Sequence, residues 1–474
     1  MSEADLQMLD AVFGPGPGTT PEERAAQSKQ IFVRGLDLLT FDHSAKARGR
    51  RLTAQEALEA YEFDKLCEVV QDGSAIITSD PVAVGRTLRE RRNQLGIDIR
   101  TVASKSGLVA SVVEALEASK RRPVREYERV ARVLGLDERL ISFNPEPQGN
   151  EKVAVRLRRI SDELPALSPS VVATLAEASW VAMTQIRLEE KLGLRRPKHD
   201  FHVSSNYGSP LGRPAYLVGY ELAQAFRKEL DLSTGPIPSM RELVEIQLAT
   251  PVIQAPLGEM IAGATVQSTR QHRAIVLNVH GKNADPRVRR TTMAHELCHL
   301  LFDPSPQLQD LRVDEYDALD ERDDLRADPI EQRANAFAVE LLAPKSEAVA
   351  RYRSSAEGAL GHFLDEFGIS FTAGRYQLWN SLKRSVALES LWAPNTAPDS
   401  TWEARETYTL AYHPLRVLAE HPSRAGRFSA VVVRAASLGA ISWDTAAEWL
   451  FSTEDEVKNA QADLQDLFPD VFKV

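Results

Sequence analysis

The stretch Thr291–Asp303, TTMAHELCHLLFD, decides how the rest of the chain is interpreted. Within it, His295, Glu296 and His299 form the pattern H-E-x-x-H. Residues four apart on a helix lie one turn apart on the same face, so both imidazoles can bind a single ion. Glu296 then lies beside that ion, where a carboxylate can act first as general base and then as general acid. The pattern therefore predicts a helix that carries a catalytic metal site.

A third protein ligand has to come from further along the chain. The metzincin pattern requires Gly and His seven and ten residues after the first His, and these positions hold Phe302 and Ser305. In the downstream run DPIEQRANAFAVELLAP, residues 328–344, Asp328 suits a helix N-cap, Pro329 the first turn, and Pro344 the end. Glu331 lies near the start of this predicted helix and could complete a His-His-Glu site. Asn335 follows one turn later, where it could orient a metal ligand.

A compact α/β pattern surrounds the motif. We expect helices over Gly219–Leu230 and, after a Ser239 cap, Met240–Leu248. The motif helix is expected to start at Thr291 or Thr292 and to end near Asp303-Pro304. Three strands are expected at Val252–Ala255, Met260–Val266 and Arg273–His280. One hypothesis is that Arg273–Val279 is a sheet edge along which an extended peptide docks.

Four segments resemble the ImmA/IrrE family of zinc-dependent peptidases: PIPSMRELVEIQLATPVI, AIVLN, RRTTMAHELCHLLF and EQRANAFAVELLAP. That family pairs H-E-x-x-H with an E-x-x-A-N-x-F-A helix, and Glu331–Ala338 match this helix position by position. The resemblance covers about Tyr216 to Leu382 and implies a zincin-like peptidase core. It also implies that Glu331 is the third ligand and that the substrate is a protein, namely a transcriptional repressor.

Three other residues allow two interpretations each. Cys298 is a soft metal ligand or a small buried hydrophobic residue, and we favour the second. His272 and His280 flank a predicted strand, where they contact substrate or have structural or surface roles; we favour the latter. The ion itself is Zn²⁺, with Mn²⁺ as the alternative, because ligands of this type accept several metals.

A basic segment interrupts an otherwise acidic protein. The chain has a net charge of −10, yet Pro81–Gly135 contains twelve Lys and Arg against six Asp and Glu. We expect four short helices here, each about ten residues long, in VGRTLRERRNQLG, IDIRTVASKSG, LVASVVEALEASK and VREYERVARVLG. Val84–Asp137 resembles the Xre-type helix-turn-helix of phage repressors, which implies a third helix in the major groove of double-stranded DNA. Arg121 and Arg122 would then contact phosphates.

This segment departs from the Xre pattern at the positions that read DNA. The polar residues usual at the starts of the second and third helices are replaced by Ile99, Val109 and Ala110. Glu114 repels phosphate, which leaves Ser111 as the obvious polar reader. Three alternatives stay open: specific DNA reading, weak backbone binding, and recognition of a protein partner such as a related repressor.

An acidic stretch precedes the second motif. Between Asp303 and Glu331 eleven Asp and Glu side chains face three Arg. We interpret this stretch as a solvated loop. The alternatives are a lid over the zinc and an acidic surface that competes with DNA for the basic segment.

Composition limits the class of protein. The 474 residues are enough for about three domains, and their apolar and charged fractions, 43% and 26%, are typical of globular proteins. Two cysteines fit a reducing compartment. The start MSEADLQMLD lacks the features of a signal peptide, and no apolar run reaches the ~20 residues of a membrane span. We therefore expect a cytoplasmic protein without membrane contact; the sequence favours no particular oligomeric state.

The predicted architecture is mainly α-helical and multidomain, with a small α/β zincin-like peptidase core and a four-to-five-helix Xre-type module. The expected parts are a helical N-terminal segment (1–80), the helix-turn-helix domain (81–145), a helical linker (146–200), the peptidase domain (201–385) and a helical C-terminal domain (386–474). Two functions compete. The first is a zinc endopeptidase that cleaves a helix-turn-helix repressor and so switches on gene expression. The second is a DNA-binding regulator whose zinc domain is a sensor or docking unit.

Overall fold

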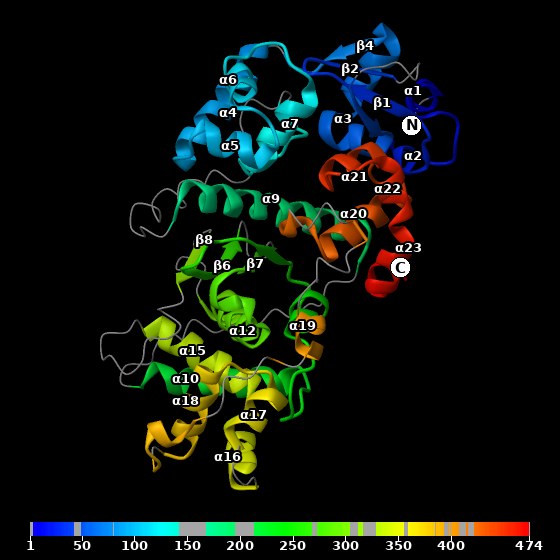
Figure 1. The fold of residues 1–474 in the computed structure, drawn as a ribbon. Coiled ribbons are helices and arrows are strands. Elements are labelled where there is room, and N and C mark those ends of the chain that lie inside the picture. The colour runs from blue at the N-terminus through cyan, green and yellow to red at the C-terminus, as the bar shows by residue number, and fades with distance from the viewer. Residues whose placement is uncertain are drawn as a thin grey trace. The chain divides into compact units, whose positions relative to one another are not determined.

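The computed structural model describes most of the chain as helices and two small sheets (Figure 1). It describes residues 3–41, 49–78, 80–141, 167–194, 213–267, 273–303, 311–315, 329–354, 359–383, 385–392, 398, 400–406, 414–415 and 421–473. The chain divides into unit 1, Met1–Arg195 with Leu410–Val474, and unit 2, Arg196–Thr409. The predicted fold class, mainly α with a small α/β core, is confirmed. Within the described residues no helix has both the length and the apolar character for crossing a membrane.

Unit 1 begins with a small sheet that the sequence patterns do not predict. The antiparallel strands, in the order β3-β1-β2-β4, are β1 (Ile31–Arg34), β2 (Leu38–Phe41), β3 (Arg50–Thr53) and β4 (Ser74–Ile76). Helices α1 (Glu3–Phe13), α2 (Pro21–Gln27) and α3 (Ala54–Asp72) accompany it. The expected helical N-terminal segment is thus a mixed α/β element. Strands of three or four residues show too little alternation to be separated from loops.

The basic segment forms the four expected helices. They are α4 (Pro81–Leu95), α5 (Ile99–Ser106), α6 (Ala110–Glu117) and α7 (Val124–Val133). Asp80 and Asp98 cap α4 and α5 through their side chains, as Asp does at helix starts. Val109 occupies the same position before α6 and makes no side-chain cap. The start of α6 therefore lacks the side-chain cap of α4 and α5, as does the start of α7 at Pro123.

The remaining helices of unit 1 come from two distant parts of the sequence. Helix α9 (Pro169–Lys191) is largely buried and packs on α5, α7 and α20. After the short turn η7 (Pro422–Arg424) the C-terminal helices are α20 (Arg427–Ser437), α21 (Trp443–Trp449), α22 (Glu454–Asn459), α23 (Gln461–Leu467) and α24 (Pro469–Phe472). Helix α21 packs on β3, so the C-terminal end of the chain belongs to the same unit as the N-terminal sheet.

Unit 2 contains the second sheet, in the order β5-β7-β6-β8. Figure 1 labels β6, β7 and β8 of this sheet. Its strands are β5 (Val252–Ala255), β6 (Ile261–Gln267), β7 (Arg273–Asn278) and β8 (Leu311–Glu315). Strand β7 pairs with β5 in parallel and with β6 antiparallel, so the hypothesis that it is a sheet edge is wrong. Both sides of β7 already carry partners, which leaves no row of backbone groups for a peptide. Strand β8 lies inside the acidic stretch, which is therefore not wholly a loop; most of that stretch lies outside the described residues.

The helices of unit 2 pack around this sheet. They are α10 (Ala215–Glu229), α11 (Met240–Glu242) with η2 (Leu243–Gln247), η3 (Gly281–Ala284), α12 (Pro286–Phe302), α15 (Pro329–Leu342), α16 (Lys345–Ser354), α17 (Ala359–Phe367), α18 (Phe371–Ser381), η4 (Leu388–Ser390) and α19 (Ser400–Glu406). Helix α12 starts five residues before the predicted Thr291. Asp285 caps it and Pro286 occupies its first turn, a start signal that outweighs the threonines. The predicted end is correct, since the last residue is Phe302.

Candidate functional site

Helix α12 carries His295, Glu296 and His299 in the interior of unit 2. All three side chains are fully buried. The helix packs against β6 and β7 and against α15, so its metal-motif residues lie between a sheet and a second helix. Cys298 is buried in the hydrophobic core with Leu297 and Leu300, which agrees with its interpretation as a small apolar residue. His280 lies exposed after β7, and His272 lies outside the described residues.

Three ligand atoms converge at one point. The Nε2 atoms of His295 and His299 are 2.9 Å apart. One carboxylate oxygen of Glu331 is 3.2 Å from Nε2 of His295, and the other is 3.8 Å from Nε2 of His299. Bonds of about 2.0 Å to a tetrahedral zinc ion would separate its ligand atoms by about 3.3 Å. These three residues therefore have the spacing that one small ion requires.

The hydrogen bonds of the imidazoles fix which nitrogen faces the centre. Nδ1 of His295 lies 2.8 Å from Oδ1 of Asn335, and Nδ1 of His299 lies 2.8 Å from Oδ2 of Asp303. Both partners are acceptors, so each Nδ1 carries the hydrogen and each neutral ring presents a lone pair at Nε2. Two lone pairs 2.9 Å apart beside a carboxylate repel one another unless a cation lies between them. The donor set thus fits a divalent ion such as Zn²⁺ or Mn²⁺.

Arg333 holds Asp303 from the other side. Its guanidinium donates to Oδ1 of Asp303, and both side chains are almost fully buried. The carboxylate of Asp303 therefore bonds to His299 and Arg333 at once, which keeps it in place. A carboxylate that accepts the second N–H of a metal-binding imidazole fixes the ring and makes it a stronger ligand.

Helix α15 places Glu331 beside the two histidines, and its own position is set by close packing on α10. A Cβ at Gly219 of α10 would lie 2.3 Å from the carbonyl oxygen of Arg333 and 2.9 Å from Cβ of Ala336. Only glycine permits this approach. Glu331 lies in the first turn of α15, and Asn335, one turn later, reaches the same cluster. Asp328, the predicted cap of α15, lies outside the described residues.

The carboxylate of Glu296 lies against strand β6. The hydroxyl of Thr265 donates to Oε2 of Glu296 at 2.7 Å. Oε1 of Glu296 lies over Gly263, where a Cβ would approach it to 2.8 Å. Neither residue of β6 stood out in the sequence, and neither did Asp303. The spacing of four residues between His299 and Asp303 is the one signal in the sequence that could have identified Asp303 as a hydrogen-bond partner of His299.

The residues predicted to read DNA lie on exposed parts of unit 1. Ser111 and Glu114 are exposed on α6, and Arg121 is exposed after it. Arg122 instead forms an ion pair with Glu126, with Nε of the arginine 2.7 Å from a carboxylate oxygen. One of the two predicted phosphate contacts is therefore already engaged within the chain.

Much of the positive charge of the basic segment is neutralised inside unit 1. Glu448 of α21 accepts hydrogen bonds from three arginines of α7, namely Arg125, Arg129 and Arg132. Arg125 also donates twice to Asp444 of the same helix, at 2.7 and 2.9 Å. The basic face of α7 thus forms ion pairs with the acidic residues of α21.

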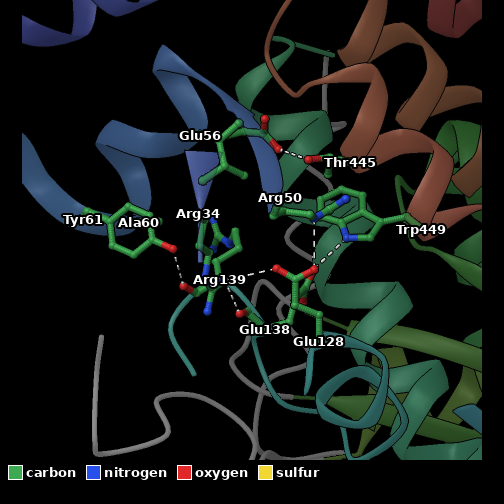
Figure 2. Close-up of a pocket in the computed structure, with 11 residues that line it drawn as sticks. Arg34, Arg50, Glu56, Ala60, Tyr61, Glu128, Glu138, Arg139, Thr445 and Trp449 are labelled. Atoms are coloured by element: carbon green, nitrogen blue, oxygen red, sulfur yellow. Dashed lines mark hydrogen bonds and ion pairs between the residues drawn. The ribbon is translucent and has the colours of Figure 1, made fainter. Parts of the chain in front are cut away.

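A buried pocket beside this contact has no excess charge. Its lining contains three arginines and three glutamates, and among them Glu128 forms ion pairs with both Arg34 and Arg50 (Figure 2). Glu138 accepts the indole N–H groups of Trp180 and Trp449, at 2.8 and 2.6 Å. Arg34 donates to the carbonyl oxygen of the same residue at 2.7 Å. Balanced charges and short internal bonds indicate a structural link between the sheet, the basic helices and the C-terminal helices. The lining residues are Arg34, Arg50, Leu52, Glu56, Ala60, Tyr61, Glu128, Glu138, Arg139, Thr445 and Trp449.

Comparison with known protein families identifies one part of the chain. Residues 247–378 match the Peptidase_M78 family model, described as an IrrE N-terminal-like domain. The matched stretch contains α12 and α15, and with them every residue of the cluster around His295 and His299. The match supports a metallopeptidase-type function for this stretch, and hence a protein substrate. No curated protein matches the chain.

Proposed function

We propose that unit 2 is a zinc-dependent endopeptidase that cleaves a specific protein, a transcriptional repressor with a helix-turn-helix, and so switches on gene expression. The observation that carries the catalytic part is the convergence of His295, His299 and Glu331, whose ligand atoms lie within 4.8 Å of one another. The family match of the same stretch supports it. The choice of a repressor as substrate rests on the resemblance to ImmA/IrrE peptidases.

Each buried residue of the site has its own role in this proposal. His295, His299 and Glu331 would hold the ion, and Asn335 and Asp303 keep the two imidazoles in the tautomer that exposes Nε2. When bound, the ion supplies Lewis-acid polarisation of the scissile carbonyl and of the attacking water. Glu296 takes a proton from that water as the C–O bond forms, and returns it to the amine nitrogen as the C–N bond breaks.

DNA binding by the basic segment is the second candidate function. The exposed Ser111 and Arg121 favour it. The pairing of Arg122 with Glu126, and of three α7 arginines with Glu448, removes cations that a strong phosphate-binding surface would use. We therefore rank this function below proteolysis and propose weak, backbone-directed binding.

The test is a cleavage reaction with defined components. The purified full chain, loaded with Zn²⁺, is incubated with purified helix-turn-helix repressors encoded beside its gene, with and without a chelator. We expect one repressor to be cut at one position, and the chelator to stop the reaction. Cleavage that continues in a fully demetallated sample would contradict a metal-dependent mechanism, and no cleavage of any repressor would contradict the proposed substrate.

A further inference from the structure

Strand β6 contacts both oxygens of the Glu296 carboxylate. Gly263 and Thr265 are two residues apart, so both point to the same face of the strand. That face is covered by α12, because β6 packs on this helix. Thr265 reaches Oε2 of Glu296 with its hydroxyl, and Gly263 leaves room for Oε1.

We propose that Thr265 is a positioning residue for the general base Glu296, and that the missing side chain at Gly263 is a requirement of the same arrangement. This inference rests on the proposed peptidase function. Beyond that function, it states how strand β6 holds the carboxylate of Glu296 on α12 in one orientation. Neither residue ligates the ion in this account.

The hydrogen bond from Thr265 has the features of a strong contact. Its length of 2.7 Å is that of a well-formed O–H···O hydrogen bond, and both side chains are nearly or fully buried. A buried carboxylate could otherwise rotate about its terminal torsion, which has broad minima. Because the hydroxyl binds one oxygen, it fixes the plane in which the carboxylate receives and returns a proton. Orientation of this kind raises the rate of the chemical step rather than the affinity for substrate.

Gly263 provides the space for the other carboxylate oxygen of Glu296, Oε1. A Cβ at this position would lie 2.8 Å from Oε1 of Glu296, 3.1 Å from the carbonyl oxygen of Val276 and 3.2 Å from Cγ2 of Thr292. The backbone of β7 cannot retreat, since Gly263 is paired with Leu277 in the sheet. Any side chain at 263 therefore displaces the base.

Asn283 keeps β6 and α12 in this register. Its amide donates to the carbonyl oxygen of Ala262 at 2.8 Å, next to Gly263, and its oxygen accepts the hydroxyl of Thr292 at 2.9 Å. Thr292 lies one helical turn before Glu296. The strand and the helix are thus tied together at the level of the base, so the contact with Thr265 is part of a fixed interface.

The direct test compares crystal structures of the zinc-soaked full chain as wild type, Thr265→Val and Thr265→Ser. Valine has the shape of threonine but no hydroxyl, and serine keeps the hydroxyl. We expect the Glu296 carboxylate to rotate or lose order in Thr265→Val, to keep its orientation in Thr265→Ser, and zinc to remain bound in both. An unchanged carboxylate in Thr265→Val would overturn the proposal, whatever the enzyme cleaves.

Kinetics supply the second arm, with the repressor that wild type cuts as the probe. Loss of a hydrogen bond to a charged group should lower kcat of Thr265→Val by about tenfold or more with KM unchanged, and Thr265→Ser should restore it. Gly263→Ala should lower kcat in the same way. Thr445→Val is the matched control, because it removes a buried threonine hydroxyl from the carboxylate of Glu56 in unit 1. An equal loss of kcat in this control would show that Thr265 has only a structural role. If the wild type cuts no repressor, the proposed function is contradicted, and the crystal structures alone decide the role of Thr265.

Discussion

His295 and His299 are the residues on which the proposed metal site depends, and each ring is held at its Nδ1 nitrogen. Nδ1 of each ring is bonded to a side-chain oxygen, and Nε2 faces the other histidine and Glu331. A neutral imidazole in a fixed tautomer is the form in which histidine binds metals. The site is therefore organised by its protein partners.

Replacement of any one ligand should remove the metal. We expect about one Zn²⁺ per chain in wild type, and loss of that ion in His295→Ala, His299→Ala and Glu331→Ala, because a catalytic zinc site normally has three protein ligands. His362→Ala is the control, since His362 is exposed and far along the sequence. Metal analysis of the purified variants measures the outcome; full occupancy in Glu331→Ala would exclude Glu331 from the site.

The sequence predicted the site residues that belong to the two motifs, including Glu331 and Asn335 of α15, and missed Thr265 and Asp303, which lie outside them. His295, Glu296 and His299 follow from a spacing of one helical turn, and Glu331 followed from a second motif. Thr265 contacts Glu296 through the packing of a strand on a helix, 31 residues apart in sequence. No periodicity within one element encodes such a pair. Cross-element contacts need the tertiary structure.

At the scale of elements, the predictions for the basic segment succeeded, also for α6 and α7, which have no side-chain cap. The ends of α4 and α5 are marked by Asp80, Asp98 and two glycines, and all four basic helices were found. The strands β1 to β4 were missed because each is too short to show a period of two. Strand β8 was missed because it lies inside the acidic stretch, whose run of charges favours a loop.

The ion pairs between α7 and α21 predict how the free energy of unfolding changes at acid pH. Burial works to raise the pKa of Glu448, but the hydrogen bond from Arg129 and the charges of Arg132, Arg129 and Arg50 outweigh it, so the pKa lies well below its usual value. A carboxyl whose pKa is lowered in the folded state contributes stability that is complete above the unfolded-state value of 4.5 and is lost as the pH falls below it. Glu448→Gln should therefore lower the free energy of unfolding by about 3 kcal/mol at neutral pH and by less at acid pH.

Hydrogen exchange of α7 and α21, or urea unfolding, at neutral pH and near pH 3.5 measures this difference. The control is Glu454→Gln, which breaks an exposed pair with Lys458 at 3.2 Å and should change stability by less than about 0.5 kcal/mol. A deficit of Glu448→Gln that is equal at both pH values would contradict a lowered pKa at this site.

At the scale of the whole molecule, part of the net charge of the basic segment is compensated by residues far away in the sequence. The basic excess of Pro81–Gly135 suggested DNA, yet three of its arginines bind the acidic residues of α21. These acids lie more than 300 residues away in the sequence. The composition of a segment reports its charge, whereas only the fold shows how much of that charge is compensated.

DNA binding should accordingly be weak and governed by a few exposed cations. Arg89, Arg100, Lys120 and Arg121 are exposed on the basic segment, where the exposed Arg86 pairs with Asp80 at 3.6 Å. Contacts from these four would give a slope of log affinity against log salt no steeper than about −4, with little dependence on DNA sequence. We expect Arg121→Ala to weaken binding more than Arg122→Ala, because Arg122 is paired with Glu126, and Arg129→Ala to have no effect.

Salt-dependent binding assays on several duplexes measure these differences. A much steeper slope, or a loss of affinity in Arg129→Ala, would show that the α7 arginines leave α21 to bind phosphate. A tight footprint on one operator that disappears in Ser111→Ala would establish sequence-specific reading.

The central claim is that Glu296 makes this metal centre a peptidase, and the variant Glu296→Gln tests it most directly. Glutamine keeps the size of the side chain and can still accept the hydrogen bond of Thr265, but it cannot act as a base. The measurement is the rate of repressor cleavage by wild type and Glu296→Gln at equal zinc content. We predict that the variant keeps its metal, still binds the repressor, and cleaves it about 10²- to 10⁴-fold more slowly. Cleavage at the wild-type rate by a fully zinc-loaded Glu296→Gln protein would contradict the account.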